Sequence, residues 1–402
     1  MEENAWLETI LKKNAYDKSI SKVLNVSMES VVPEGNYYTS VIYTAKIDVL
    51  LRSGRKSKIS LIIKTTHQEG DIAELLKKNP IFKGETKFYS DIFSKFDQLM
   101  DDYQDNREKL WCNMIGYIPY DTIAFDDLKA ENYTMADRTK FLDKNHALLV
   151  LNSLGRFHAM GHVLMKKGLV SKEDFLLYYL EMDDHPVVNN MFQGGLKQLC
   201  HVMETEWPAE WNNVVNRLKA QIDVAVKRLK ALFSKDTFQT ICHGDCWTCN
   251  MMFKYCPYDE KVPVAMKFVD MQGAHLNSFG FDILHVLYTS VRSDIRNAYW
   301  NDLIKEYHRS LKSTMSLYEM EDFTPTLEKI NEELKRLEYY SFIVNLLIFP
   351  IHCYDKPGAF KMENIDENRD GMNAFDPGIF NTDKYKTEVQ KQLMKWLDEG
   401  LY

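Results

Sequence analysis

The spacing of apolar residues predicts a short helix followed by strands in the first third of the chain. Apolar side chains recur at helical spacing from Trp6 to Leu11, which indicates an opening amphipathic helix. The segments after it are rich in Val, Ile, Tyr and Thr, the composition of strands. We predict strands over residues 39–51, 59–63, 111–118 and 122–128, with a helix beginning at Asn79 between the second and the third.

Beyond Lys129 the periodicity becomes mostly helical. We predict helices over residues 148–158 and 214–233, and from 281 to the end apart from a loop rich in Gly and Asn at 366–381. Two short strands at 250–255 and 265–269 interrupt this helical part. The pattern therefore predicts an α+β fold with a small β-rich lobe, a hinge near residues 126–130 and a larger α-rich lobe. A ligand site between two lobes is the usual arrangement.

Composition and charge narrow the class of protein. The chain has 402 residues, of which 45% are hydrophobic and 27% charged, so it is long enough and apolar enough to fold around large cores. The formal net charge is −8, and acidic and basic residues are mixed throughout. Because no long basic block occurs, nucleic acid and an anionic membrane are not expected as partners. The sequence gives no indication of an oligomeric state.

Targeting features favour a cytoplasmic protein. The N-terminus has no apolar run behind a basic start, so a secretory signal is not predicted. The longest apolar stretch, residues 342–351, is about half of the roughly 20 residues that a membrane span needs. The seven cysteines are an odd, clustered set and do not suggest a disulfide framework, so a reducing compartment is expected.

The segment His243-Gly244-Asp245-Cys246-Trp247-Thr248-Cys249-Asn250 contains the strongest chemical motif. If the two short strands after it form an antiparallel hairpin, Asn250 and Asp270 lie side by side at its open end. Carboxylate and amide oxygens there suit a hard cation. Asp245 could accept a hydrogen bond from a substrate hydroxyl. Phosphoryl transfer needs Mg²⁺ and a lysine on the phosphates and an aspartate that orients the nucleophile, and the Asp245-to-Asn250 spacing equals that of the kinase catalytic loop.

These motifs resemble those of the ecdysteroid kinase-like (CHK kinase-like) family in the aminoglycoside phosphotransferase and choline kinase superfamily. The H-G-D-x-W-x-x-N segment and Asp270-x-Gln272 are similar to the family's catalytic and metal motifs. Further segments resemble the family in the same order along the chain, from about Gly35 to Tyr288. They are Gly35-Asn36-Tyr37, Leu61-Ile62-Ile63-Lys64, Glu85-x-x-Phe88-Tyr89, Phe125-Asp126-Asp127-Leu128, Leu154-Gly155-Arg156-Phe157-His158-Ala159 and Phe281-Asp282-Ile283-Leu284.

The resemblance implies a protein-kinase-like bilobal fold, with a nucleotide-binding lobe at residues 1–128 and a catalytic and substrate-binding lobe at 129–402. It also implies ATP and Mg²⁺ as cofactors and the hydroxyl of an ecdysteroid or a similar apolar polyol as acceptor. Asp245 would be the catalytic base, with Asn250 and Asp270 as catalytic residues that hold the metal. The implied nucleotide-binding residues are Asn36, Tyr37, Thr39, Lys64, Glu85, Asp126 and Leu128. Asp282 would brace the catalytic loop.

Several residues in the motifs have ordinary structural explanations. His158 is expected to be a hydrogen-bonded core histidine, His243 to hold the catalytic loop, and Trp247 to pack. Two positions depart from the family pattern, because Met271 stands where Phe is common and Asp126 where Glu is usual. Neither is a position of the expected chemistry, so an inactive relative is not predicted.

Three alternatives stay open. Cys246-x-x-Cys249 could indicate zinc or a redox pair, although a structural zinc normally needs a second pair. The enzyme could be a choline-like or detoxification kinase acting on other hydroxylated compounds, with Asp183 and Asp184 near a cationic substrate. The chain could also bind a nucleotide or steroid without turnover.

An apolar substrate wall is predicted from segments 178–192, 207–211 and 342–354, where aromatic and Met residues adjoin helix breakers.

Overall fold

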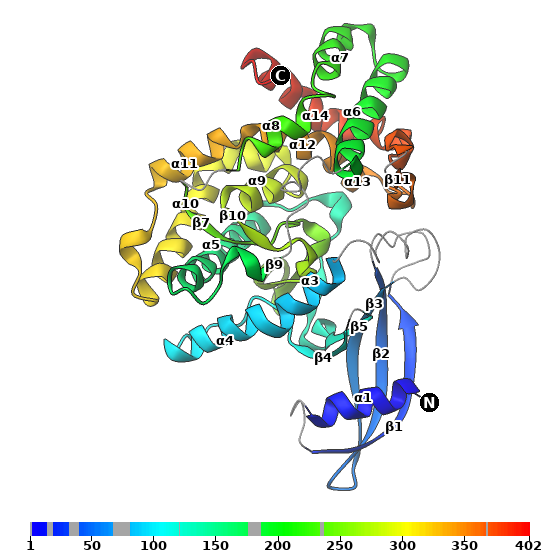
Figure 1. The fold of residues 1–402 in the computed structure, drawn as a ribbon, viewed down its shortest axis with the longest axis vertical. Coiled ribbons are helices and arrows are strands. Elements are labelled where there is room, and N and C mark those ends of the chain that lie inside the picture. The colour runs from blue at the N-terminus through cyan, green and yellow to red at the C-terminus, as the bar shows by residue number, and fades with distance from the viewer. Residues whose placement is uncertain are drawn as a thin grey trace.

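The computed structural model describes residues 2–13, 19–31, 40–66, 81–119, 121–175, 186–233, 237–366 and 369–402. An antiparallel sheet forms one end of the molecule and a larger helical body forms the other (Figure 1). The predicted α+β class, with a small β-rich lobe and a larger helical one, is confirmed. The lobe boundary at residue 128 stays a prediction.

The N-terminal sheet has five strands in the order β1-β2-β3-β5-β4, and all its pairs are antiparallel. They are β1 (Ile20–Ser30), β2 (Ser40–Leu51), β3 (Lys56–Thr66), β5 (Thr122–Asp126) and β4 (Met114–Ile118). Helix α1 (Glu2–Lys13) contributes Leu7 and Leu11 to a small core with Ala45 and Ile47 of β2. Strand β1 was not predicted, because most of its residues are exposed and the apolar alternation is weak.

One continuous helical segment leads from the sheet into the larger lobe. It comprises α3 (Ile81–Lys87), a π-helical turn (Phe88–Ile92) and α4 (Phe93–Asp102). Phe93 stacks on Trp111 at 4.6 Å, and Phe96 stacks on Phe157 of the body at 5.5 Å. The segment therefore packs into the core of the larger lobe while its first turns reach back to the sheet.

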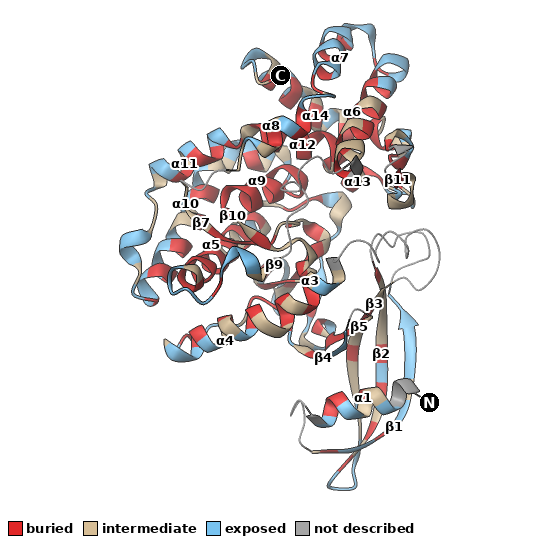
Figure 2. Ribbon diagram, in the orientation of Figure 1, coloured by how far each residue is buried: buried red, intermediate tan, exposed pale blue. Residues whose placement is uncertain are grey.

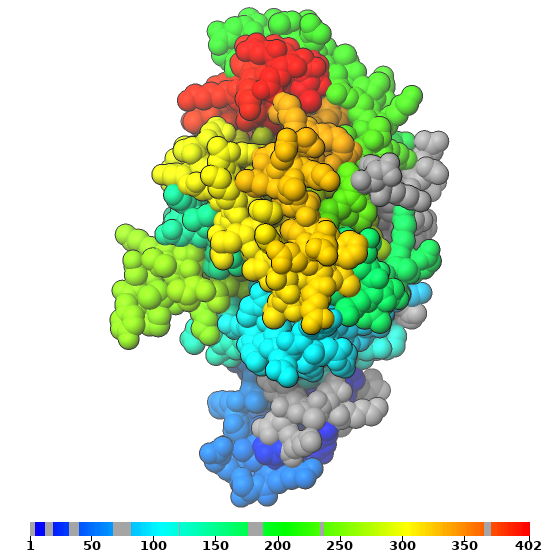
Figure 3. All heavy atoms as spheres, turned by 90° about the vertical axis from the view of Figure 1, so that its left-hand side faces the viewer, coloured from blue at the N-terminus to red at the C-terminus, as the bar shows by residue number. Residues whose placement is uncertain are grey.

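The body is built around α5 (Lys144–Lys166) and α9 (Gly280–Thr289), whose buried residues are conspicuous in Figure 2. The other helices are α6 (Pro186–Glu206), α7 (Asn212–Lys219), α8 (Ala225–Lys230), α10 (Ser293–Leu317), α11 (Leu327–Arg336), α12 (Glu338–Leu347), α13 (Phe349–Cys353) and α14 (Asp383–Asp398). Helix α10 covers much of the face shown in Figure 3. Within the described residues, we find no helix whose length and apolarity would allow it to cross a membrane.

Short sheets carry the loops of the larger lobe. Strands β6 (Tyr133–Met135), β8 (Met251–Cys256) and β9 (Asp259–Phe268) form one, β7 (Gln239–Cys242) and β10 (His275–Ser278) a second, and β11 (Ile365–Asp366) and β12 (Arg369–Asp370) a third. The β7–β10 pair was not predicted. Because His275 pairs with Cys242, this sheet joins the two ends of the segment that contains the His243–Asn250 motif and the Asp270-x-Gln272 motif. We call these two motifs the motif loops.

The single helix predicted over residues 214–233 is wrong, since α7 and α8 are separated by turns at 220–224. The buried Gln221 lies at this break. Its Oε1 accepts hydrogen bonds from Arg228 Nη1 at 2.7 Å and from Tyr339 OH at 3.2 Å. These contacts with α8 and α12 explain why tertiary structure overrides the helical periodicity here.

Candidate active site

The β8–β9 hairpin brings Asn250 and Asp270 together. Met251 pairs with Phe268, and the Val269 N–H donates to the Asn250 carbonyl at 3.0 Å, so the ladder continues to the open end of the hairpin. Asp270 follows directly with φ of 64°, in the left-handed region that non-glycine residues rarely adopt. Backbone strain of this kind concentrates at functional sites.

The loop before the hairpin sets the orientation of Asp245. Asn250 Nδ2 donates to the carbonyl and to Oδ2 of Asp245, both at 2.9 Å. Because the amide nitrogen is committed in this way, the Asn250 side-chain oxygen points away from Asp245. Gly244 has φ of 80°, and a Cβ there would lie 1.9 Å from the Gly273 carbonyl oxygen. Only glycine fits at this position, which lets the two motif loops touch.

The Asp282 carboxylate on α9 holds the loop that begins at His243 by accepting hydrogen bonds from backbone N–H groups of that loop. Its Oδ2 accepts from the His243 N–H at 2.7 Å and from His158 Nε2 at 3.0 Å, and its Oδ1 accepts from the Gly244 N–H at 2.9 Å. Burial alone would raise the pKa of Asp282, but the hydrogen bonds from His158 and from the Gly244 N–H help to outweigh it, and the pKa is lowered to about 2. Asp282 thus braces the loop and His158 is a hydrogen-bonded core histidine, as expected from the sequence.

His243 joins the loop to the hairpin. Its Nε2 lies 3.0 Å from the Val269 carbonyl, and its Nδ1 accepts from the Asp245 N–H at 3.3 Å. Burial lowers the pKa of His243, so the ring is neutral with the proton on Nε2. Trp247 packs, as expected, and stacks on His352 at 4.2 Å.

A buried lysine links the sheet to the motif loops. Lys64 Nζ on β3 lies 2.7 Å from Glu85 Oε2 on α3 and 2.8 Å from Asp270 Oδ1. Burial by itself lowers the pKa of Lys64, but the facing carboxylates of Asp270 and Glu85 raise it, so the lysine is charged. Burial raises the pKa of Glu85 to about 7 against the opposing effect of Lys64.

Asp245 lies in an environment that weakens its acidity. Its side chain keeps 34% of its surface exposed, while burial and then the negative charge of Asp270 raise its pKa to about 7. A carboxylate with a pKa near neutrality suits general-base chemistry. His285 on α9 also lies close, with its Nε2 3.8 Å from Asp245 Oδ1. The sequence reading missed His285, although its spacing of three residues from Asp282 puts both on one helix face.

The donor set fits a hard cation. The Asn250 amide oxygen points away from Asp245, and Asp270 uses only Oδ1 for Lys64, so oxygen ligands remain on both side chains. By contrast, the Cys246–Cys249 pair would need further ligands to form a structural zinc site. Among the described residues, the one His/Cys/Asp/Glu group close enough to hold a metal is His158, Cys242 and Asp282, not the Cys246–Cys249 pair.

The other predicted nucleotide-binding residues lie in the segment predicted to be a hinge or outside the described residues. Asp126 ends β5, and its Oδ2 accepts from Asn113 Nδ2 at 2.7 Å. Leu128 is buried at the start of a short 3-10 helix. Asn36, Tyr37 and Thr39 fall in the undescribed segment 32–39. The roles of all these residues stay predictions.

The predicted apolar wall is mostly core. Trp207 donates from Nε1 to the Phe380 carbonyl at 3.1 Å and meets Trp211 edge to face, and both are buried. Phe349 is also buried and stacks on Phe141. Of the residues named for that wall, His352 contacts the catalytic loop through Trp247. Residues 178–185 lie outside the described residues.

Comparison with known proteins agrees with these motifs. The sequence model of the ecdysteroid kinase-like family matches residues 34–320, more than half of the chain. No curated protein matches the sequence of this chain. Among solved structures, an aminoglycoside 3′-phosphotransferase of type VIII is similar at 12% identity and a TM-score of 0.32, over 74% of this chain and 94% of its own. A mutant aminoglycoside 2′-phosphotransferase IIIa with GDP is similar at 9% identity and a TM-score of 0.35, over 85% and 91%.

Proposed function

Because the chain belongs to the ecdysteroid kinase-like family, we propose that it is an ATP-dependent kinase that phosphorylates a hydroxyl group of a small molecule. The observation that carries the proposal is the contact of Lys64 with Asp270, 206 residues away in sequence, beside Glu85. This contact brings a candidate phosphate-binding cation to a candidate metal ligand. Asp245 completes the set, since it is bonded to Asn250, the second candidate ligand.

Each side chain has a distinct role in the proposed reaction. Asp245, with a pKa raised to about 7, would accept the proton of the substrate hydroxyl, and Asn250 would keep one carboxylate oxygen in place. Lys64, which stays charged, would bind the nucleotide phosphates and be positioned by Glu85. Asn250 and Asp270 would hold Mg²⁺. The bound cation would neutralise charge that develops on the transferred phosphoryl group.

For the acceptor we propose an ecdysteroid or a similarly apolar polyol, on the basis of the family. A choline-like or detoxification kinase is the main alternative, and a nucleotide- or steroid-binding protein without turnover is the other. A choline-type substrate would need aromatic faces or carboxylates around its cation. An apolar polyol would instead bury surface on binding, which gives a negative heat-capacity change.

Mass spectrometry of a substrate panel incubated with Mg-ATP tests the proposal. We expect a phosphate ester of a polyhydroxylated steroid, and no product with excess chelator. Faster phosphorylation of choline, ethanolamine or an aminoglycoside than of every steroid would favour the alternative kinase. Tight binding of nucleotide or steroid without product or ADP would indicate a binding protein.

A further inference from the structure

His285 is a buried histidine with one unused ring nitrogen beside the candidate base. It lies on α9 with 5% of its surface exposed. Its Nδ1 is 2.8 Å from the Tyr340 hydroxyl on α12. Its Nε2 has no hydrogen-bond partner among the described residues and lies 3.8 Å from Asp245 Oδ1. A buried polar atom without a partner costs stability, so it calls for an explanation.

The protonation state of His285 follows from its neighbours. Burial lowers its pKa to about 4, so the ring is neutral near pH 7 and carries one proton. If Nδ1 carried that proton, the Nε2 lone pair would face the Asp245 carboxylate whenever Asp245 is ionised, as a general base must be, and two acceptors would then oppose each other. With the proton on Nε2, the Tyr340 hydroxyl donates to Nδ1, and the Nε2–H points toward a carboxylate oxygen. The second arrangement places a donor opposite an acceptor at both ring nitrogens.

We propose that His285 is a positioning residue for Asp245, with Tyr340 fixing the ring so that its Nε2–H steadies Asp245 Oδ1 during phosphoryl transfer. The proposal rests on the proposed kinase function. Asn250 already bonds the other oxygen at 2.9 Å, so a bond from His285 would stop the carboxylate from rotating. The separation of 3.8 Å is longer than a hydrogen bond. Catalytic hydrogen bonds are often long without substrate and tighten in the reactive complex.

His162 provides a matched control within the same chain. It is also buried, its Nδ1 lies 2.7 Å from the Gln239 carbonyl, and its Nε2 also has no partner among the described residues. Its ring stacks on Phe238. His162 therefore shares the burial and the unused nitrogen of His285, but it contacts β7 and its neighbour instead of Asp245.

The first test reads the tautomer and needs no turnover. In protein labelled with ¹⁵N-histidine, long-range ¹H–¹⁵N correlation spectra distinguish an Nε2–H ring from an Nδ1–H ring, and His285→Gln assigns the signal. We expect neutral His285 with its proton on Nε2, and in Tyr340→Phe a shift of the Nδ1 resonance. A proton on Nδ1 in the wild-type protein would overturn the proposal.

The second test separates positioning from packing by kinetics. His285→Phe keeps an aromatic ring without nitrogens, and we expect kcat with the polyhydroxylated steroid to fall about 10- to 100-fold with the KM for ATP unchanged. His285→Gln, whose amide can donate from near the Nε2 position, should recover most of the loss. His162→Phe should leave kcat unchanged.

The outcomes distinguish this proposal from the kinase proposal. An unchanged kcat in His285→Phe, or an equal loss in His162→Phe, would refute the role of His285 while the kinase stands. If wild-type protein and Asp245→Asn are equally inactive on every acceptor, the kinase proposal fails instead. If His285→Phe does not fold, His285→Gln and the tautomer measurement still decide the question, since a wild-type-like fold with the Nδ1–H tautomer contradicts it.

Discussion

Two charged clusters in this molecule, each with a buried carboxylate, have opposite balances of charge. The framework cluster consists of Asp105, Arg107, Arg156 and Tyr318. The site cluster consists of Lys64, Glu85 and Asp270, together with Asp245 near Asp270. In the framework cluster one carboxylate faces several donors, whereas in the site cluster two carboxylates share one lysine. From this balance of charge we infer that the framework cluster stabilises the fold and that the site cluster binds a ligand.

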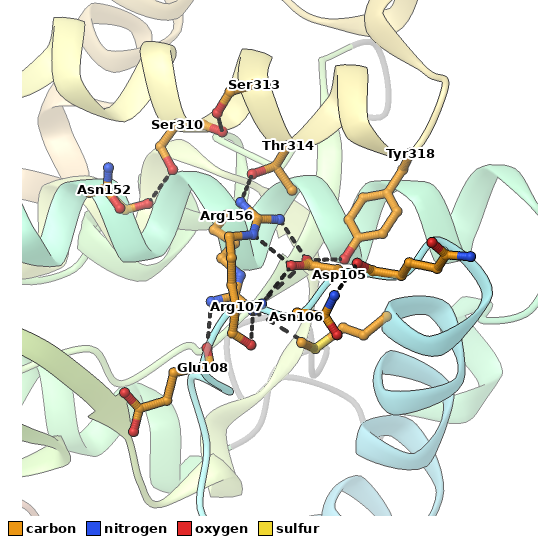
Figure 4. Close-up of polar contacts among 12 residues, drawn as sticks. Asp105, Asn106, Arg107, Glu108, Asn152, Arg156, Ser310, Ser313, Thr314 and Tyr318 are labelled. Atoms are coloured by element: carbon orange, nitrogen blue, oxygen red, sulfur yellow. Dashed lines mark hydrogen bonds and ion pairs between the residues drawn. The ribbon is translucent and has the colours of Figure 1, made fainter.

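The framework cluster ties the segment after α4 to α5 and α10 (Figure 4). Asp105 Oδ2 accepts from Arg107 Nη2 at 2.6 Å and from Tyr318 OH at 2.7 Å, and its Oδ1 accepts from Arg107 Nε at 2.8 Å. Burial would raise the pKa of Asp105, but these bonds outweigh it and lower the pKa to about 2. Arg107 Nη1 also donates to Thr314 Oγ1 at 3.0 Å. Several donors therefore hold the Asp105 carboxylate as an ion.

The site cluster has an excess of negative charge. Lys64 is the shared partner of Glu85 and Asp270, and Asp245 lies near Asp270. The pKa values of Glu85 and Asp245 are both raised to about 7, by burial first. Strongly perturbed carboxylates that gather in one place mark a functional site more often than a structural one. Comparing the two clusters therefore predicts that changes in one reduce catalysis and changes in the other reduce stability.

The largest effect is expected from Asp245→Asn. The amide can occupy the same space and keep an oxygen toward Asn250, but it cannot accept the substrate proton, so kcat should fall by about 10²- to 10⁴-fold. Steady-state ADP formation measures the loss, and circular dichroism should show an unchanged fold. A variant that keeps more than a tenth of the wild-type kcat would remove Asp245 from the proposed chemistry.

A substitution in the framework cluster should lower the stability of the protein and leave kcat unchanged. Asp105→Asn removes the negative charge that faces the largely buried Arg156, so we expect a loss of about 3–5 kcal/mol in the free energy of unfolding. Urea unfolding monitored by tryptophan fluorescence measures it. At a temperature where the variant is folded, its kcat should match the wild type. Loss of kcat without loss of stability would reverse the proposed division of roles.

A smaller effect is expected from Glu85→Gln. The amide oxygen can still accept from Lys64, but the site loses one of its surplus charges and Lys64 is held less firmly. We expect kcat/KM for ATP to fall about 10-fold, because Lys64 is the residue proposed to bind the phosphates. The free energy of unfolding should stay unchanged or rise, because the buried charge is removed. A destabilisation as large as that of Asp105→Asn would show that Glu85 is a framework residue.

Short-range features of the fold and the site could be predicted from the sequence. Asp245, Asn250 and Asp270 lie within one loop and one hairpin, so strand periodicity was sufficient to place the last two at the same end. The strand over 40–51 has a clear apolar pattern because alternate residues enter the small core. Strand β1 was missed because an exposed edge strand has little apolar alternation to detect.

Contacts between distant segments could not be derived from spacing. Lys64 meets Asp270 only through the packing of the sheet against the motif loops, and the motif resemblance supplied what periodicity could not. His285 has the sequence context of an ordinary core histidine, and its position beside Asp245 depends on how α9 packs under the loop. The aromatic residues around Trp207 looked like a pocket because helix breakers adjoin them, but they pack against α14 and the segment before it.

The smallest effect concerns pH, and its sign differs between the two clusters. The pKa of Asp105 falls from 3.8 to about 2 on folding, so its contribution to stability is present above pH 3.8 and is lost as pH falls toward 2. The pKa of Asp245 rises from 3.8 to about 7, so its contribution is present below pH 3.8 and is lost as pH rises toward 7.

The stability of two variants as a function of pH tests this difference without a substrate. With chelator present, Asp245→Asn should gain stability relative to wild type as pH rises from 5 to 8, because the Asp245 carboxyl group, which only the wild type has, favours the unfolded state more as pH rises. The gain should be modest, since a third of the Asp245 side chain is exposed and solvent screens its charge. Asp105→Asn should show a constant deficit over the same range, since Asp105 is ionised throughout. Urea unfolding at each pH gives both curves, and parallel curves would contradict the opposite charge balance of the two clusters.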